Sequence, residues 1–203
     1  MRPITKTAVA LAATLVATAA RAQVHAHDGV YLRLDLGGGY MEQQTPTNTT
    51  AGDLKLSGGA GSFGVAVGGA VAENLILAGH LYSNVISDPS VSFSNGGSAS
   101  ASDTTASMVG IGPELTYYFM PVNVYLSGTV AATRLSLKVN GQDGDSEWGI
   151  GARLALGKEW WVSENWGLGL AGLVSWSSNK DQGTNAPTIS TWGLGVAFSA
   201  TYN

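Results

Sequence analysis

Alternation of large apolar residues with small or polar ones runs through most of this chain. Between Trp166 and Trp176 one set of alternate residues is apolar, the other is mostly small or polar, and none is charged. A period of two is typical of a β-strand with two different faces, and no helical period fits as well. Ten residues at about 3.3 Å each, tilted by about 40°, cover about 25 Å of height. The stretch therefore predicts a tilted strand with an aromatic residue at each end of its apolar face.

The same alternation returns in seven further segments. The eight predicted strands are 30–40, 63–71, 75–85, 109–119, 124–133, 148–160, 166–176 and 191–202. Their connections alternate in length, with short ones at 72–74, 121–123 and 163–165 and long ones at 43–58, 87–104, 140–147 and 178–188. Short turns at one end and longer loops at the other are typical of barrels that cross a membrane. We therefore expect an all-β fold, an eight-stranded antiparallel up-and-down transmembrane β-barrel.

The first residues have the pattern of a secretory signal peptide. Arg2 and Lys6 precede an apolar run from Ala8 to Ala20, and an A-x-A cleavage pattern ends at Ala22. The alternative, a membrane anchor helix, is disfavoured because the run is too short to span about 30 Å of hydrocarbon. We expect residues 1–22 to be a signal peptide and residues 23–203 to form one barrel domain.

Composition supports this division and excludes other classes. Without Arg2, Lys6 and Arg21, seven Lys and Arg residues remain against fourteen Asp and Glu, a formal charge of −7. A general nucleic-acid-binding protein needs a basic face, so nucleic acid is not an expected partner. The chain has no cysteine, and only 12% of its residues are charged, about half of the usual share. An exported chain with so few charged residues is expected to present one face of its strands to lipid.

The sequence resembles the small eight-stranded outer-membrane β-barrel proteins of Gram-negative bacteria, the OmpA/OmpX type. The resemblance covers residues 23–203 and is carried by the architecture and by the segments "GIGPELTYYF", "VNVYLSGTV" and "WVSENWGLGLAG". It implies a monomer in the bacterial outer membrane, surrounded by outer-membrane lipids and lipopolysaccharide, without cofactor or metal. Periplasmic chaperones and the barrel assembly machinery are the implied partners during biogenesis. Pro113 departs from the pattern, because a mid-strand proline cannot donate a ladder hydrogen bond, and we expect a bulge there.

Strand parity sorts the side chains into lipid-facing and lumen-facing sets. The predicted aromatic girdles on the lipid-facing side are Tyr40, Trp148, Trp160, Trp166, Trp176, Trp192 and Tyr202. An eight-stranded lumen is just wide enough for side chains to fill. The predicted interior charge network is Arg33, Asp35, His80, Glu114, Arg153 and Glu159, and the predicted aromatic plug is Tyr31, Tyr118, Tyr125 and Trp161. Because buried charges must pair, we expect both arginines to pair with carboxylates of this network.

These features predict an integral outer-membrane protein with a structural or surface-display role and at most limited passage of small solutes. One alternative is a gate in which the interior ion pairs exchange, and another is a gated narrow conduit for small hydrophobic molecules. A soluble barrel that holds a lipid is disfavoured, because the charged residues share the inward face with the glycines.

A lipid-modifying enzyme would need a histidine with a serine and a carboxylate. His80 faces inward and Ser83 faces the other way, so contact along this strand is disfavoured and we expect no catalytic residues. The stretch from His25 to His27 is expected to be a solvated tail and not a metal site. Arg134 is expected at the height of the outer head groups, either close to lipopolysaccharide phosphates or simply solvated.

Overall fold

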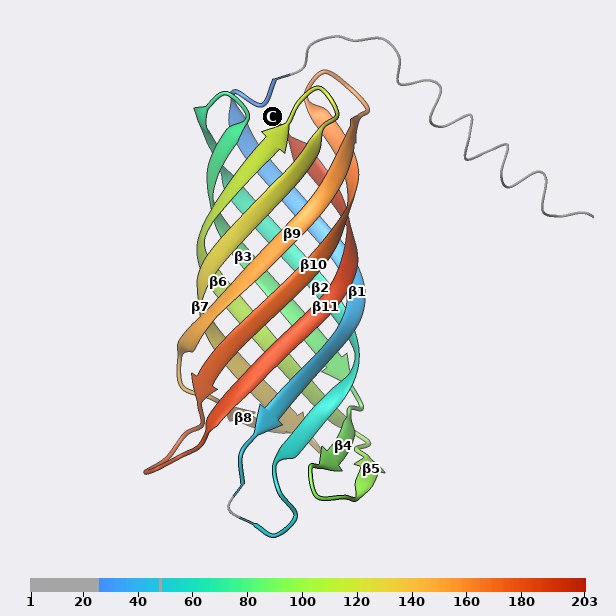
Figure 1. The fold of residues 1–203 in the computed structure, drawn as a ribbon, viewed down its shortest axis with the longest axis vertical. Coiled ribbons are helices and arrows are strands. Elements are labelled where there is room, and N and C mark those ends of the chain that lie inside the picture. The colour runs from blue at the N-terminus through green and yellow to red at the C-terminus, as the bar shows by residue number, and fades with distance from the viewer. Residues whose placement is uncertain (1–25, 48) are drawn as a thin grey trace, which may run out of the picture.

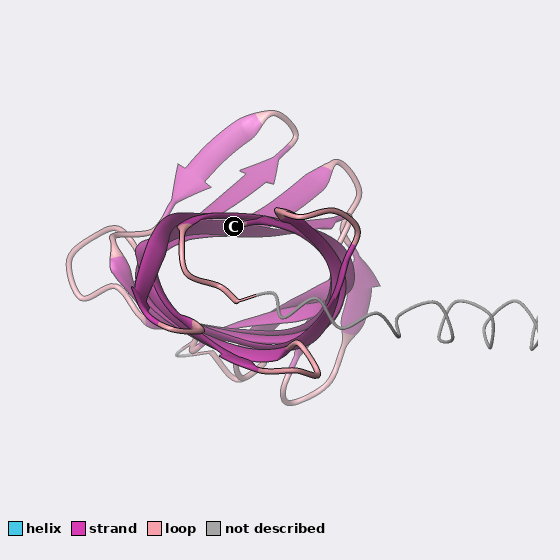
Figure 2. Cartoon of the chain, turned by 90° about the horizontal axis from the view of Figure 1, so that it is seen from above, coloured by secondary structure: helices cyan, strands magenta, loops and turns pink. Residues whose placement is uncertain are grey.

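One antiparallel sheet closes on itself in the computed structural model, which describes residues 26–47 and 49–203 (Figures 1 and 2). The predicted signal peptide lies outside the described residues. The barrel strands are β1 (Val30–Thr45), β2 (Leu54–Ala72), β3 (Leu75–Ser87), β6 (Thr104–Phe119), β7 (Val124–Val139), β9 (Gly149–Trp161), β10 (Trp166–Lys180) and β11 (Thr188–Tyr202). The predicted eight-stranded antiparallel barrel is confirmed. Three short strands, β4 (Ser90–Phe93), β5 (Ser98–Ser100) and β8 (Gln142–Asp145), project from the loops.

Each barrel strand pairs with its neighbours in the chain, and β1 closes the ring by pairing with both β2 and β11. Arg33, for example, lies opposite Ala66 on one side and Thr201 on the other. The short turns gather at one end with the C-terminus, which we call the turn end, and the long connections gather at the opposite, loop end (Figure 1). Asn74 and Asn123 adopt positive φ angles in two of these turns, a conformation that asparagine tolerates well.

The strands are longer at the loop end than predicted. Residues 54–58, 104–108, 134–139 and 177–180 continue strands β2, β6, β7 and β10, although part of this sequence was expected to be loop. Serine, threonine and lysine make up half of the residues in these extensions, so their composition is partly that of loops. The connections after β1, β3 and β10 are consequently shorter than predicted, whereas the connection between β7 and β9 spans residues 140–148 and contains β8.

The bulge expected at Pro113 is wrong. Pro113 lies opposite Gly79 in a continuous register with β3. On the other side, the pairs Ile111–Ala132 and Glu114–Thr129 have the same register, so no extra residue is inserted. The strand instead omits the β7 pairings of Gly112 and Pro113, which accommodates the missing donor. The register shift that the barrel does contain lies in β2, between Ala70 and Ala72.

Apolar side chains cover the outside of the barrel. Leu168, Leu170, Leu194 and Val196 are 49%, 47%, 58% and 67% exposed, while the residues that alternate with them on β10 and β11 are mostly buried. A protein core is normally arranged the other way round, so this outer surface suits a hydrocarbon environment. Separately, no helix among residues 26–47 and 49–203 is long and apolar enough to span a bilayer.

Candidate functional site

The interior of the barrel is filled by three layers of side chains stacked between its two ends. A turn-end stopper is built around His27 and Tyr118, an ionic layer around Arg33 and Glu114, and an apolar layer around Met108. All five of these side chains are at most 1% exposed. The lumen is therefore the candidate functional site, and what each layer contains decides whether anything can pass.

The turn-end stopper closes the barrel at the end where β1 begins. The ring of His27 stacks on that of Tyr118 with centroids 3.5 Å apart, and its Nε2 lies 2.9 Å from Asn123 Oδ1. Its carbonyl oxygen accepts a hydrogen bond from the backbone N–H of Asn74, so His27 joins two of the short turns. Figure 2 shows the segment that leads into β1 crossing inside the outline of the ring. The expected solvated tail is therefore wrong at His27, which is fully buried, and His25 lies outside the described residues.

The ionic layer is centred on the guanidinium of Arg33. Its Nη2 lies 2.7 Å from Glu114 Oε2, its Nε lies 3.2 Å from Asp35 Oδ2, and its Nη1 donates to Tyr31 Oη at 2.9 Å. Both carboxylates and the guanidinium are at most 3% exposed. Arg33 thus compensates two buried carboxylates, as such a site requires, because a lone buried charge is strongly unfavourable.

His80 attaches to the same layer through one nitrogen. Its Nδ1 lies 2.9 Å from both Glu114 Oε2 and Thr129 Oγ1, and the Thr129 hydroxyl donates to Glu114 at 3.2 Å. A catalytic relay needs the histidine to hold the nucleophile with one ring nitrogen and the carboxylate with the other. Here both groups share Nδ1 and all three side chains are at most 2% exposed, so the geometry is that of a packed network.

Arg153 and Glu159 do not pair as expected. Arg153 extends across the lumen toward β2, where Nη2 donates to Ser62 Oγ at 3.2 Å, and its Cζ lies 5.1 Å from the centre of the Tyr82 ring. No carboxylate of the described residues forms an ion pair with it. Glu159 accepts hydrogen bonds from Thr201 at 2.7 Å and Tyr118 at 3.4 Å. The pairing prediction is right for Arg33 and wrong for Arg153, because the long side chain reaches a different strand.

The four residues of the predicted aromatic plug lie toward the turn end. The hydroxyls of Tyr31 and Tyr118 are 3.3 Å apart, and the rings of Tyr118 and Tyr125 have centroids 5.4 Å apart. These three tyrosines are fully buried. Trp161 is half-buried beside His27, with ring centroids 5.0 Å apart. The plug is therefore continuous with the turn-end stopper on one side and with the ionic layer on the other.

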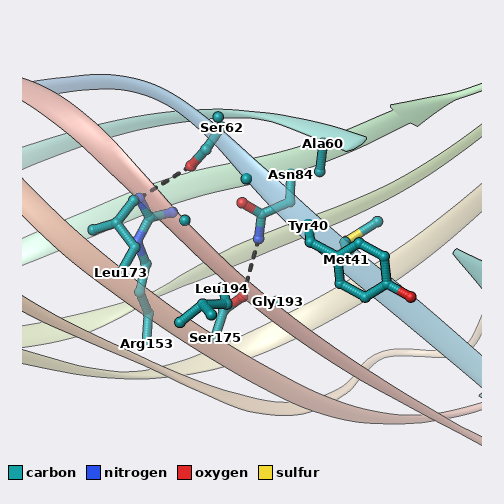
Figure 3. A pocket seen from close by; sticks show the side chains of 13 residues that line it. Tyr40, Met41, Ala60, Ser62, Asn84, Arg153, Leu173, Ser175, Gly193 and Leu194 are labelled. Carbon is teal, nitrogen blue, oxygen red and sulfur yellow. Dashed lines mark hydrogen bonds between the residues drawn. The ribbon is translucent and has the colours of Figure 1, made fainter. Parts of the chain in front are cut away.

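The apolar layer fills the lumen toward the loop end. It consists of Met41, Tyr82, Ile86, Met108, Ala131 and Leu135, with Ala60 and Ile189 packed against it. A cavity of about 20 Å³ lies between this layer and the ionic layer, bordered by Arg153, Ser62, Asn84 and Ser175 (Figure 3). That volume holds about one water molecule. The strand alternation already placed Tyr82 on the inward face, but most of this layer was missed.

The predicted girdle residues lie on the outside in two rings. Tyr40, Trp148, Trp176 and Trp192 form the loop-end ring and are exposed. Trp160 and Trp166 are exposed, and Tyr202 half-buried, at the turn end. Neighbouring strands bring girdle rings together, with centroids 5.4 Å apart both in the Tyr40–Trp192 pair and in the Trp166–Tyr202 pair.

Beyond the loop-end ring, Arg134 is bound by the protein itself. Its Nη2 lies 2.9 Å from Asp145 Oδ2, and both side chains are more than a third exposed. Within residues 26–47 and 49–203, no group of three or more His, Asp or Glu side chains is placed to hold a metal ion.

Comparison with known proteins agrees with this architecture. The outer membrane protein β-barrel domain family matches residues 8–199. Neisserial surface protein A is 17% identical over 87% of this chain and 97% of its own, with a TM-score of 0.52. OprG from Pseudomonas aeruginosa is 11% identical over 90% of this chain and 100% of its own, with a TM-score of 0.43. No curated protein matches the sequence. The likeness to Neisserial surface protein A, at 17% identity, shows a common fold and no common activity.

The family match spans nearly the whole chain, and the observed barrel has the strand number, the short turns and the reversed polarity that this family requires. The resemblance to the OmpA/OmpX type is confirmed with it. This chain belongs to the outer membrane β-barrel protein family and resides in the bacterial outer membrane.

Proposed function

We propose that this protein is a plugged barrel that supports the outer membrane and displays its loops, and that its resting form passes no ions. The observation that carries the proposal is the continuous filling of the lumen by stopper, ionic layer and apolar layer. An ion needs a water-lined path, whereas the cavity beside Arg153 holds about one water molecule.

Conductance across a planar lipid bilayer tests the proposal. Refolded protein, checked by its faster migration on unboiled gels, is expected to give no discrete current steps at either polarity. A general porin refolded in the same detergent is the positive control. Discrete steps that recur with each preparation, and that disappear after the protein is boiled, would contradict a plugged barrel.

One observation favours a second candidate, a gate. Arg153 Nη1 and Asp35 Oδ1 are buried and have no hydrogen-bond partner among the described residues, so the two charges have partners still to gain. In a gate, Arg153 leaves Ser62 and pairs with Asp35, which changes the obstruction of the lumen. A gate predicts brief current openings in the wild type that the Arg153→Met variant alters, whereas a plugged barrel predicts silence in both. A conduit for hydrophobic molecules needs the same opening.

Catalysis is no part of the proposed function. The burial of His80, Glu114 and Thr129 and the shared Nδ1 contact support this view, because no substrate reaches them without unpacking the lumen. Incubation of the refolded barrel with outer-membrane phospholipid and lipopolysaccharide, followed by mass spectrometry, is expected to return both lipids unchanged. A product that disappears in the His80→Ala variant would contradict the assignment.

The proposed surroundings and partners follow from the location. We expect the apolar outer face to contact outer-membrane lipids and lipopolysaccharide, and periplasmic chaperones and the barrel assembly machinery to handle the chain before insertion. We also expect a monomer. Cross-linking during depletion of the assembly machinery, and the mass of the protein–detergent complex by light scattering, test these expectations.

A further inference from the structure

The polarity of the strands reverses where they pass the loop-end girdle. Within the membrane band apolar side chains point outward, but beyond Tyr40, Trp148 and Trp192 they point inward. The inward set in these extensions contains Leu54, Leu56, Leu135, Leu137, Val139 and Ile189. The outward set contains Glu42, Gln44, Lys55, Ser57, Arg134, Ser136 and Lys138. Within the length of one strand, the outer surface of the barrel therefore changes from apolar, as lipid requires, to polar, as water requires.

This reversal does not produce a closed core. The extensions border a loop-end vestibule that is open to solvent and has a volume of about 420 Å³. Its lining is the inward apolar set together with Gln43, Thr45, Ser136, Ser146, Asp181 and residues of β8. Leu54, Leu56, Leu137 and Ile189 are only half-buried, and Val139 is 40% exposed. Leaving apolar surface wet is unfavourable in proportion to its area. A volume of this size lies in the usual range for a small-molecule site.

The acidic residues along the vestibule wall are Asp143, Asp145 and Asp181, and no lysine, arginine or histidine lines it. Asp143 and Asp145 lie opposite Lys138 and Ser136 of the outward set, so their side chains share the outward face. Asp145 is paired with Arg134 at 2.9 Å, and Asp143 is paired loosely with Lys138 at 3.7 Å.

Asp181 differs from the other two acids. Its Oδ1 accepts a hydrogen bond from the backbone N–H of Gln182 at 2.8 Å, but it forms no ion pair with any residue that the structure describes. The vestibule thus combines an apolar wall with one uncompensated carboxylate.

We propose that the loop-end vestibule binds a small amphiphile with a compact apolar body and a single cationic group. The apolar body covers Leu56 and Leu137, which are partly exposed to solvent, and the cation lies beside Asp181. The charge complementarity selects this occupant over a neutral or anionic molecule of the same shape. Binding takes place on the loop-end side of the apolar layer and requires no passage through the lumen. The proposal is therefore independent of whether the barrel conducts ions.

The test uses three water-soluble probes that share one rigid hydrocarbon cage: 1-adamantanamine, 1-adamantanol and 1-adamantanecarboxylate. Wild-type barrel is placed in nanodiscs of zwitterionic phosphatidylcholine, and empty nanodiscs provide the correction for partition into lipid. Titration calorimetry, with NMR chemical shifts of the loop-end residues as a second readout, measures affinity and stoichiometry.

The amine is expected to bind saturably at one site per barrel, the alcohol up to about fivefold more weakly, and the carboxylate most weakly. The Asp181→Asn variant is expected to lower the affinity for the amine to that for the alcohol and to leave the alcohol unchanged. Asp103→Asn removes an exposed acid outside the vestibule and is the matched control, with no effect expected.

A second pair of variants tests the apolar wall. Leu137→Trp fills the vestibule and is expected to abolish binding of both amine and alcohol, whereas Leu168→Trp makes the same change on the lipid face and leaves binding intact. Gel mobility confirms folding, and Ile189→Phe replaces Leu137→Trp if that variant does not fold.

Two groups of results overturn the proposal. Uptake no greater than that of empty nanodiscs, or binding that survives filling of the vestibule, excludes the site. Equal affinity for amine and carboxylate, or equal effects of the two Asp→Asn changes, excludes the cationic occupant.

Discussion

Replacement of Arg33 by methionine is expected to be among the most destabilising single changes in the barrel. The guanidinium joins Asp35, Glu114 and Tyr31 at 3.2, 2.7 and 2.9 Å, and the three charged groups are at most 3% exposed. Methionine fills much of the space but leaves two buried carboxylates without their cation. Removal of one partner of a buried ion pair typically costs about 3–5 kcal/mol, so we expect a loss in that range.

Arg134→Met is the matched control. Arg134 also contacts a carboxylate, Asp145 at 2.9 Å, but these side chains are 41% and 38% exposed. Water solvates both charges whether or not they pair, and exposed pairs contribute about 0–1 kcal/mol. The same chemical change is thus expected to differ by several kcal/mol in effect between lumen and surface.

Equilibrium unfolding by urea in lipid vesicles measures both variants. The emission of the six tryptophans reports insertion, and unboiled gel mobility reports closure of the barrel. Addition of Glu114→Gln to Arg33→Met should recover at least about 1 kcal/mol relative to the sum of the single changes, because contacting charges couple. If Arg33→Met lies within about 1 kcal/mol of Arg134→Met, the ionic layer is not the buried, mutually compensating cluster argued above.

Three further predictions use the same unfolding assay. A Cβ at Gly64 would lie 2.9 Å from His80 Nε2, so Gly64→Val is expected to cost about 1–3 kcal/mol, whereas Gly61→Ala points into open space and should stay within about 0.5 kcal/mol; equal costs would contradict the packing. Phe198→Arg, near mid-height on the lipid face, is expected to cost about 2–4 kcal/mol, and a neutral result would argue against hydrocarbon there. His27→Ala removes a ring stack and a buried hydrogen bond and should cost about 1–3 kcal/mol, while a solvated tail predicts no change.

The alternation of residue types with a period of two predicts much of this fold from the sequence. Each barrel strand separates hydrocarbon from a packed lumen, so parity alone distinguishes Leu170 from Gly169 and Val196 from Ala197. The same parity placed Arg33 and Glu114 in the interior, where the structure has them.

Contacts between strands could not be predicted in this way. Parity gives the face and the height of Arg153, but a long side chain reaches several strands, and here it crosses to Ser62 on β2. His27 precedes the first strand and belongs to no alternation, so nothing local marks it as a stopper. The loop-end extensions were missed because Leu54, Leu56 and Leu137 invert the polarity that identified the strands below them.

Closure of the ring by β1 and β11 has a consequence for biogenesis. β1 pairs with β2, the next barrel strand, and with β11, the last strand of the chain. A barrel in which β11 has not yet paired would expose two unsatisfied rows of amide and carbonyl groups to acyl chains, at several kcal/mol for each group. Such an open barrel is worse off in lipid than in water, so we expect insertion to be completed only when β11 pairs with β1.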